Sequence, residues 1–185
     1  MGRGVLLDYA DWTERNNISS PPLESTKISL KQLQQIAEEE AITFRPGDIL
    51  FIRSGFTKAY EALNNHDRQA LAARATPRFI GVEPSTEVLQ WLWENQFSAV
   101  AGDAPSFEVA PVGAINPDPD ISLHQWLLAG WGMPIGEMFD LEALSRHCKD
   151  TGRYSFFLSS VPLKVVTNNA FGKYHYSCTS RFQEA

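Results

Sequence analysis

Short apolar runs alternate along the chain with segments in which apolar residues recur at helical spacing. The strand-like runs lie at 5–7, 49–55, 79–84, 97–103, 133–139 and 154–166. Helical spacing predicts helices after Ser29 and over 56–75, 85–96, 124–131 and 141–152. Strands and helices that alternate in this way indicate an α/β domain.

Boundary residues sharpen several of these predictions. Ser29 is followed three residues later by Gln32, which is the spacing of a capping box. Asp140 can cap the helix over 141–152, and Gly152 is a plausible C-terminal stop for it. The segment 110–120 reads as a loop because of its Pro, Gly, Asn and Asp content. From Thr167 onward neither period continues, so we expect a peripheral tail.

Composition restricts the class of protein. The chain has 185 residues, enough for one domain with a sizeable core, and 43% of them are hydrophobic. Its net charge of -6 argues against a surface for nucleic acid or for an anionic membrane. No apolar stretch approaches the about 20 residues of a membrane span, so no membrane partner is expected. The two cysteines lack metal-ligand spacing, and we expect a reducing, cytoplasmic location.

His124 and Glu137 are ionisable residues in otherwise apolar surroundings, within "ISLHQWLLAGWGMPIGEMFDL" at 121–141. Burying such groups alone is costly, so each must be exposed, paired or bound to something. His124 could simply bond a nearby carbonyl at the start of a helix. A metal ion would instead satisfy both side chains, since imidazole and carboxylate are ordinary zinc ligands. Periodicity and spacing leave both interpretations open.

Asp103 ends the strand-like run "FSAVAGD", where α/β sheets tend to present functional groups. It could contact substrate or support a metal ligand, or it could cap the turn that follows. Among the other histidines, His66 lies in a polar helical segment and is expected to be solvated. His147 lies late in a helix, where the helix dipole favours positive charge.

Other catalytic motifs are missing from the sequence. There is no G-x-S-x-G, P-loop, G-x-G-x-x-G or H-E-x-x-H pattern. Cys148 directly follows His147, and adjacent helix positions point apart, so they do not form a nucleophile pair.

Five blocks in order resemble the cyclase family of metal-dependent hydrolases, which includes kynurenine formamidases, and their wording is most similar to the fungal branch. They are "RGVLLDY" (3–9), "FRPGDILFIRSGFTKAY" (44–60), "GVEPSTEVLQWLWENQFSAVAGDAPSFE" (81–108), "LHQWLLAGWGMPIGEMFDLEAL" (123–144) and "GRYSFFLSSVPLKV" (152–165).

The resemblance implies a swivelling β/β/α fold and a divalent metal, zinc or manganese. It implies that His124 and Glu137 are metal ligands. The metal would activate water to hydrolyse a small-molecule amide or formamide such as N-formylkynurenine, a step of tryptophan catabolism to kynurenine. A homo-oligomer is also expected.

One departure from the family pattern is large. Family members carry an H-x-G-T-H-x-D-x-x-x-H type motif before the "RGVLLD" block, and this chain has none. The sequence therefore resembles the C-terminal part of a family protein, with a cyclase-like domain over 3–165 and a tail over 166–185. Two ligands fall short of the about three that catalytic zinc takes from a protein, and no catalytic residue is assigned. The alternative to a hydrolase is an inactive short form that acts by binding.

Overall fold

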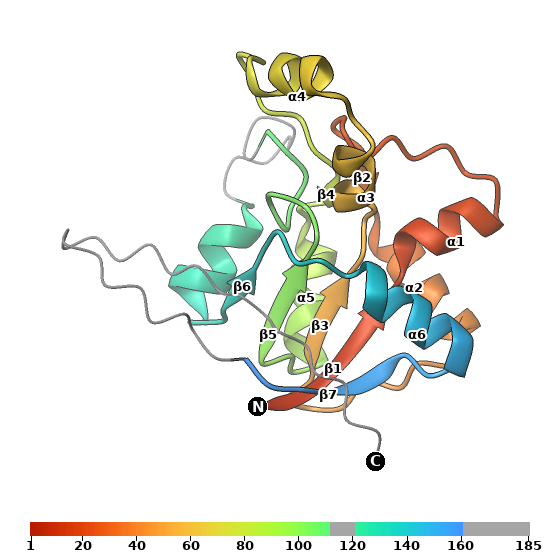
Figure 1. The fold of residues 1–185 in the computed structure, drawn as a ribbon. Coiled ribbons are helices and arrows are strands. Elements are labelled where there is room, and N and C mark those ends of the chain that lie inside the picture. The colour runs from red at the N-terminus through yellow and green to blue at the C-terminus, as the bar shows by residue number, and fades with distance from the viewer. Residues whose placement is uncertain (112–120, 161–185) are drawn as a thin grey trace.

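A five-stranded sheet forms the centre of the computed structural model, which describes residues 1–111 and 121–160 (Figure 1). The strand order is β6-β5-β3-β1-β7. Neighbouring strands are parallel except at the edge, where β7 runs antiparallel to β1. The bounds are β1 Gly2–Leu7, β3 Ile49–Ile52, β5 Ala99–Gly102, β6 Ile135–Gly136 and β7 Ser155–Leu158. A second, parallel sheet pairs β2 (Lys27–Ile28) with β4 (Gly81–Val82). The predicted α/β class is confirmed, and the structure adds that the central sheet is mainly parallel.

Side chains of the central strands alternate between two apolar clusters, because successive residues of a strand point to opposite faces. Val5 and Leu7 of β1 join the cluster that contains the buried residues of α2 (Leu30–Glu39) and α5 (Thr86–Glu94). Leu6 joins the cluster covered by α6 (Glu142–Thr151). The sheet is therefore buried on both faces, as parallel sheets require.

Helix ends follow the local signals in the sequence. Ser29 and Gln32 form the predicted capping box at the start of α2. Gly152 ends α6 with a φ of 63°, a left-handed conformation that favours glycine. Asp140 accepts a hydrogen bond from the backbone N–H of Glu142 at 3.1 Å, although Leu141 occupies the capping position.

Most predicted strands are shorter in the structure, and residues 161–166 of the strand predicted over 154–166 lie outside the described residues. Two predicted elements differ in a way that matters for the site or the fold. The helix predicted over 56–75 is split into α3 (Phe56–Glu61) and α4 (Asn65–Ala72), because the Asn64 side chain accepts from the Asp67 N–H and begins a new helix. The strand predicted over 133–139 shrinks to β6, since Met138 has a φ of 59°. Glu137 therefore follows the strand rather than lying within it.

Three further segments complete the fold. α1 (Tyr9–Arg15), which the sequence pattern did not predict, is capped by Asp8 at the carboxyl end of β1. The predicted helix at 124–131 is present as a π-helix, η1 (Gln125–Gly130). Across 1–111 and 121–160, none of the helices has the length and apolar character needed to cross a membrane. The tail over 166–185 and most of the predicted loop over 110–120 lie outside the described residues.

Candidate metal-binding site

His124 stands immediately before η1 and lies between two carboxylates. Its Nδ1 is 2.7 Å from Oε1 of Glu108, and its Nε2 is 3.0 Å from Oε1 of Glu137. The structure therefore brings the two predicted metal ligands together across thirteen residues of sequence. It also adds a third ionisable side chain, Glu108.

Glu108 is completely buried and holds the start of η1. Besides the His124 ring, its two oxygens accept hydrogen bonds from the hydroxyl of Ser122 and from the backbone N–H groups of Leu123 and His124, each at 3.0 Å. Burial alone would raise the pKa of Glu108. The hydrogen bonds from His124 and Leu123 outweigh burial, so the pKa lies below its ordinary value and the group stays ionised.

Glu137 is anchored by the backbone as well as by His124. Its Oε1 accepts a hydrogen bond from the N–H of Phe107 at 3.0 Å. Phe107 directly precedes Glu108, so the two carboxylates that flank the imidazole are tied to one short segment. The side chain of Glu137 is 31% exposed, which leaves it open to solvent or to a small ligand.

The two carboxylates stabilise the charged form of His124. Hydrogen bonds to Glu108 and then Glu137 raise its pKa to about 9, against the opposing effect of burial. At neutral pH the metal-free ring is therefore an imidazolium that donates from both nitrogens. A cation on Nε2 would have to displace one of these protons, because only the neutral ring nitrogen binds metal.

The geometry of the pair fits a shared cation. Nε2 of His124 and Oε1 of Glu137 are 3.0 Å apart. Two ligand atoms that each lie about 2.1 Å from a zinc ion are about 3.0–3.4 Å apart for angles between perpendicular and tetrahedral. Across 1–111 and 121–160, however, there is no group of three or more His, Cys, Asp and Glu side chains that could hold a metal ion. The described part of the chain thus offers two ligand atoms.

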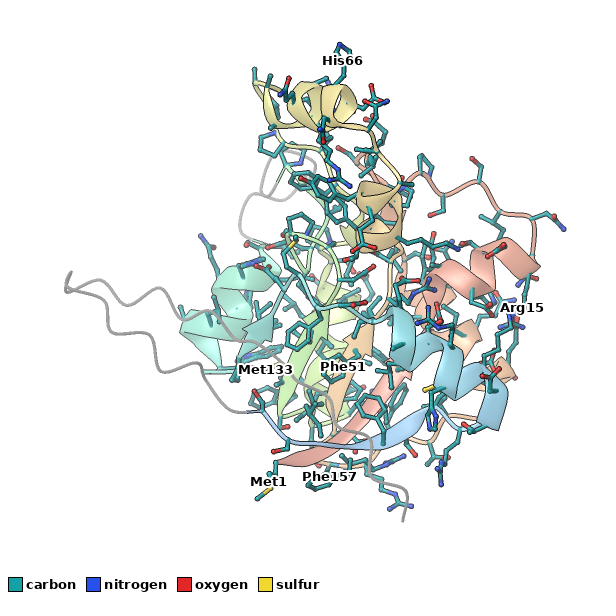
Figure 2. All side chains as sticks on the ribbon, in the orientation of Figure 1. Met1, Arg15, Phe51, His66, Met133 and Phe157 are labelled. Atoms are coloured by element: carbon teal, nitrogen blue, oxygen red, sulfur yellow. The ribbon has the colours of Figure 1, made fainter. Side chains whose placement is uncertain are left out.

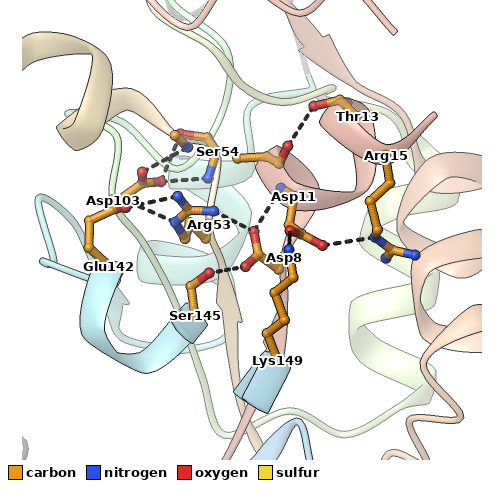
Figure 3. Close-up of polar contacts among 12 residues, drawn as sticks. Asp8, Asp11, Thr13, Arg15, Arg53, Ser54, Asp103, Glu142, Ser145 and Lys149 are labelled. Atoms are coloured by element: carbon orange, nitrogen blue, oxygen red, sulfur yellow. Dashed lines mark hydrogen bonds and ion pairs between the residues drawn. The ribbon is translucent and has the colours of Figure 1, made fainter. Parts of the chain in front are cut away.

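Asp103 lies at the end of β5 and is completely buried. Its Oδ1 accepts from the N–H and the hydroxyl of Ser54 at 2.6 and 2.7 Å, and its Oδ2 accepts from the N–H of Gly55 at 2.9 Å (Figure 3). Burial raises the pKa of Asp103, against these hydrogen bonds. Its carboxylate ties β5 to the residues that begin α3, whereas the capping interpretation expected hydrogen bonds to the turn that follows Asp103. A contact of Asp103 with substrate stays a prediction.

A second polar network joins the carboxyl ends of β1 and β3 to α6. The guanidinium of Arg53 donates to Asp8 at 2.7 Å and to both oxygens of Glu142 at 2.8 and 2.9 Å (Figure 3). Ser145 of α6 completes it with a hydrogen bond to Asp8. Sequence reasoning missed this network, because its members lie far apart in sequence and meet only through the tertiary fold.

Of the other histidines and cysteines, His66 is exposed, as its polar segment predicts, and Cys148 is buried. His66 lies at the tip of α4, far from the sheet, with its side chain 90% exposed (Figure 2). Cys148 is buried, and burial together with the charge of Asp8 raises its pKa to about 12, which disfavours the thiolate. His175 and Cys178 lie outside the described residues.

The chain matches a known protein family over its first 109 residues. The family model named Cyclase matches residues 1–109, more than half of the chain. The chain belongs to the Cyclase family. The match includes Asp103 and Glu108, whereas His124 and Glu137 lie beyond it.

Two solved structures are similar to this chain, and the first of them supports the family assignment. A crystal structure described as a novel cyclase is 30% identical, with a TM-score of 0.72, and the match covers 89% of this chain and 49% of that one. Isatin hydrolase A from Labrenzia aggregata, bound to benzyl benzoate, shares the fold at 14% identity and a TM-score of 0.51, over 73% of this chain and 46% of that one. This Cyclase chain thus spans about half the length of both. No curated protein matches it.

Proposed function

We propose that this Cyclase chain carries part of a metal-dependent hydrolase site, in which His124 and Glu137 bind one divalent cation, zinc or manganese. The observation that supports this most is the 3.0 Å distance between Nε2 of His124 and Oε1 of Glu137, with His124 held by Glu108 and Glu137 held by the Phe107 N–H. One protein with the same fold, isatin hydrolase A, is a hydrolase.

The proposed substrate is a small amide or formamide, with N-formylkynurenine as the specific candidate. Water would add to the formyl carbon, the C–N bond would break, and formate and the amine would leave, as in tryptophan catabolism to kynurenine. When bound, the cation would lower the pKa of a water molecule and polarise the carbonyl.

The residues of this chain would act by binding and orientation. Glu137, whose side chain is 31% exposed, would supply a carboxylate oxygen that solvent and a small substrate can also reach. Glu108 would keep its hydrogen bond to Nδ1 of His124, so that Nε2 stays turned toward Glu137. The proposal includes a cytoplasmic homo-oligomer and a swivelling β/β/α fold over 3–165, on the basis of family resemblance.

The second candidate is an inactive short form that binds a partner or a small molecule. It is favoured by one observation: the described residues supply two metal ligands, and catalytic zinc normally takes about three from the protein. The same chain can be tested for both candidates.

The test is hydrolysis of N-formylkynurenine by the full chain after loading with zinc or manganese, followed as formate release. His124→Asn removes the ring nitrogen that faces Glu137 but leaves an amide N–H near the position of Nδ1 for Glu108. We expect turnover to be lost in His124→Asn and Glu137→Gln and retained in His66→Ala. Turnover that survives both substitutions would refute the ligand role, and a metal-loaded chain without turnover would favour the second candidate.

A further inference from the structure

Glu108 is the most heavily hydrogen-bonded carboxylate at this site, yet its oxygens face the protein rather than the solvent. It accepts four hydrogen bonds while being completely buried. The shortest of the four, at 2.7 Å, comes from Nδ1 of His124. A buried carboxylate is costly unless it is fully bonded, so these donors fix its position closely.

The backbone on either side of Glu108 is fixed as well. The N–H of Val82 donates to Phe107 and the N–H of Val109 donates to Val82, so the segment forms a bridge with β4. Glu108 is thereby held by strand pairing on one side and by the start of η1 on the other. It can act as a rigid reference for the imidazole.

Three contacts determine how the His124 ring is oriented. Its backbone N–H and its Nδ1 both bond to Oε1 of Glu108, which pins one edge of the ring. The opposite edge then necessarily turns Nε2 toward Glu137. A ring flipped about its Cβ–Cγ bond would remove Nδ1 from Glu108 and leave a buried anion short of a donor.

We propose that Glu108 is a positioning residue that keeps the proton of the neutral His124 ring on Nδ1 and so presents Nε2 to a cation shared with Glu137. This inference rests on the proposed metal site for its purpose, but the ring orientation itself can be measured without metal. Carboxylates placed in this way behind a ligating histidine typically change metal affinity by about 10- to 100-fold when they are removed.

The first test is nitrogen NMR of histidine-labelled, metal-free full chain, followed upward in pH until the His124 signals show a neutral ring. The spectrum of His124→Asn assigns the His124 signals. We expect wild-type Nδ1 to show the shift of a protonated nitrogen and Nε2 that of an unprotonated one. Protonated Nε2 in the wild-type chain would overturn the proposal without any variant at Glu108.

The second test compares three substitutions in the same spectrum. Glu108→Gln keeps the shape of the side chain but loses the charge and one acceptor. We expect the proton of the neutral His124 ring to lose its preference for Nδ1 in this variant. Ser122→Ala removes a different donor to Glu108 and should leave the preference intact. Asp48→Asn is the control for the loss of a buried carboxylate. Asp48 directly precedes β3, is 1% exposed and forms an ion pair with Arg3 of β1. An unchanged preference in Glu108→Gln would overturn the proposal.

A zinc titration by calorimetry separates this inference from the proposed function. We expect Glu108→Gln to weaken zinc binding by about 10- to 100-fold relative to Ser122→Ala. If the wild-type chain binds no zinc, the metal site fails while the nitrogen shifts still decide the role of Glu108. If zinc binds equally well to Glu108→Gln and to wild type, the positioning role fails while the metal site stands.

Discussion

At the scale of single residues, the candidate site depends on His124, whose imidazole lies between the carboxylates of Glu108 and Glu137. His124 and Glu137 each interrupt an apolar stretch, and Glu108, between Phe107 and Val109 in "SFEVAP", interrupts one too. A lone ionisable group in an apolar run needs a partner, so the same rule points to Glu108. What the sequence could not give is the pairing, because the contact between Glu108 and His124 depends on how β4 and η1 are brought together.

The raised pKa of His124 makes a prediction about stability and pH in the metal-free chain. The ring is stabilised in its charged form, so its contribution is complete below its ordinary pKa of 6.5 and is lost as pH rises to about 9. We expect the stability advantage of wild type over His124→Asn to shrink by up to about 3 kcal/mol across this range. Urea unfolding with a chelator present measures it.

The exposed histidine provides the control for that experiment. His66→Ala removes an imidazole whose side chain is 90% exposed, and it is measured beside His124→Asn over the same pH range. A wild-type advantage over His124→Asn that stays constant or grows toward pH 9 would contradict the charged, doubly bonded imidazole.

At the scale of elements, capping signals were the most reliable guide to the fold. Ser29 and Gln32 predicted the start of α2, and Gly152 predicted the end of α6. The 56–75 helix was wrong, because apolar spacing alone did not reveal that Asn64 caps a new helix. The small β2–β4 sheet was also missed as a separate unit, since strands of two residues leave little periodicity to detect.

The close approach of β4 to the site predicts that Gly81 is needed there. A Cβ at Gly81 would lie 2.4 Å from the carbonyl carbon of Glu108, which is backbone and cannot move aside freely. We expect Gly81→Ala to lower the free energy of unfolding by about 1–3 kcal/mol and to weaken zinc binding. Gly130→Ala is the control, because its nearest contact of 3.5 Å is ordinary packing. Equal stability and zinc affinity of the two variants would contradict this role.

The Arg53 network predicts a large stability effect that involves no metal. Arg53 is 5% exposed and joins β1, β3 and α6 through Asp8 and Glu142. Arg53→Met would leave two carboxylates without their cation, and we expect a loss of about 3–5 kcal/mol in urea unfolding. Arg15→Met removes a more exposed cation, from Asp11 and Glu40, and should cost about 0–1 kcal/mol. Similar losses in the two variants would show that the buried network adds no special stability.

At the scale of the whole molecule, the candidate site lies where the start of η1 meets the end of β6 and the segment 107–109 that pairs with β4. The α/β class followed from the alternation of patterns, and Cyclase membership agrees with the five sequence blocks. The chain spans about half the length of both similar structures, so the activity of a complete site is a matter for experiment.

A homo-oligomer is the whole-molecule prediction that the surface supports. Trp93 is 61% exposed and lies 5.2 Å from the Trp131 ring, with Leu128 49% exposed on η1. Exposed apolar surface of this kind marks interaction sites. We expect light scattering to give at least twice the chain mass of 20.7 kDa, and a lower mass for Trp93→Glu. A monomer at all concentrations would contradict this prediction.

The shared cation is tested most directly by calorimetric titration of zinc and of manganese into metal-free full chain. We predict saturable binding at one ion per chain, abolished by His124→Asn and by Glu137→Gln and unaffected by His66→Ala. Wild-type chain that binds neither ion, or variants that bind as wild type does, would contradict the assignment of His124 and Glu137 as metal ligands.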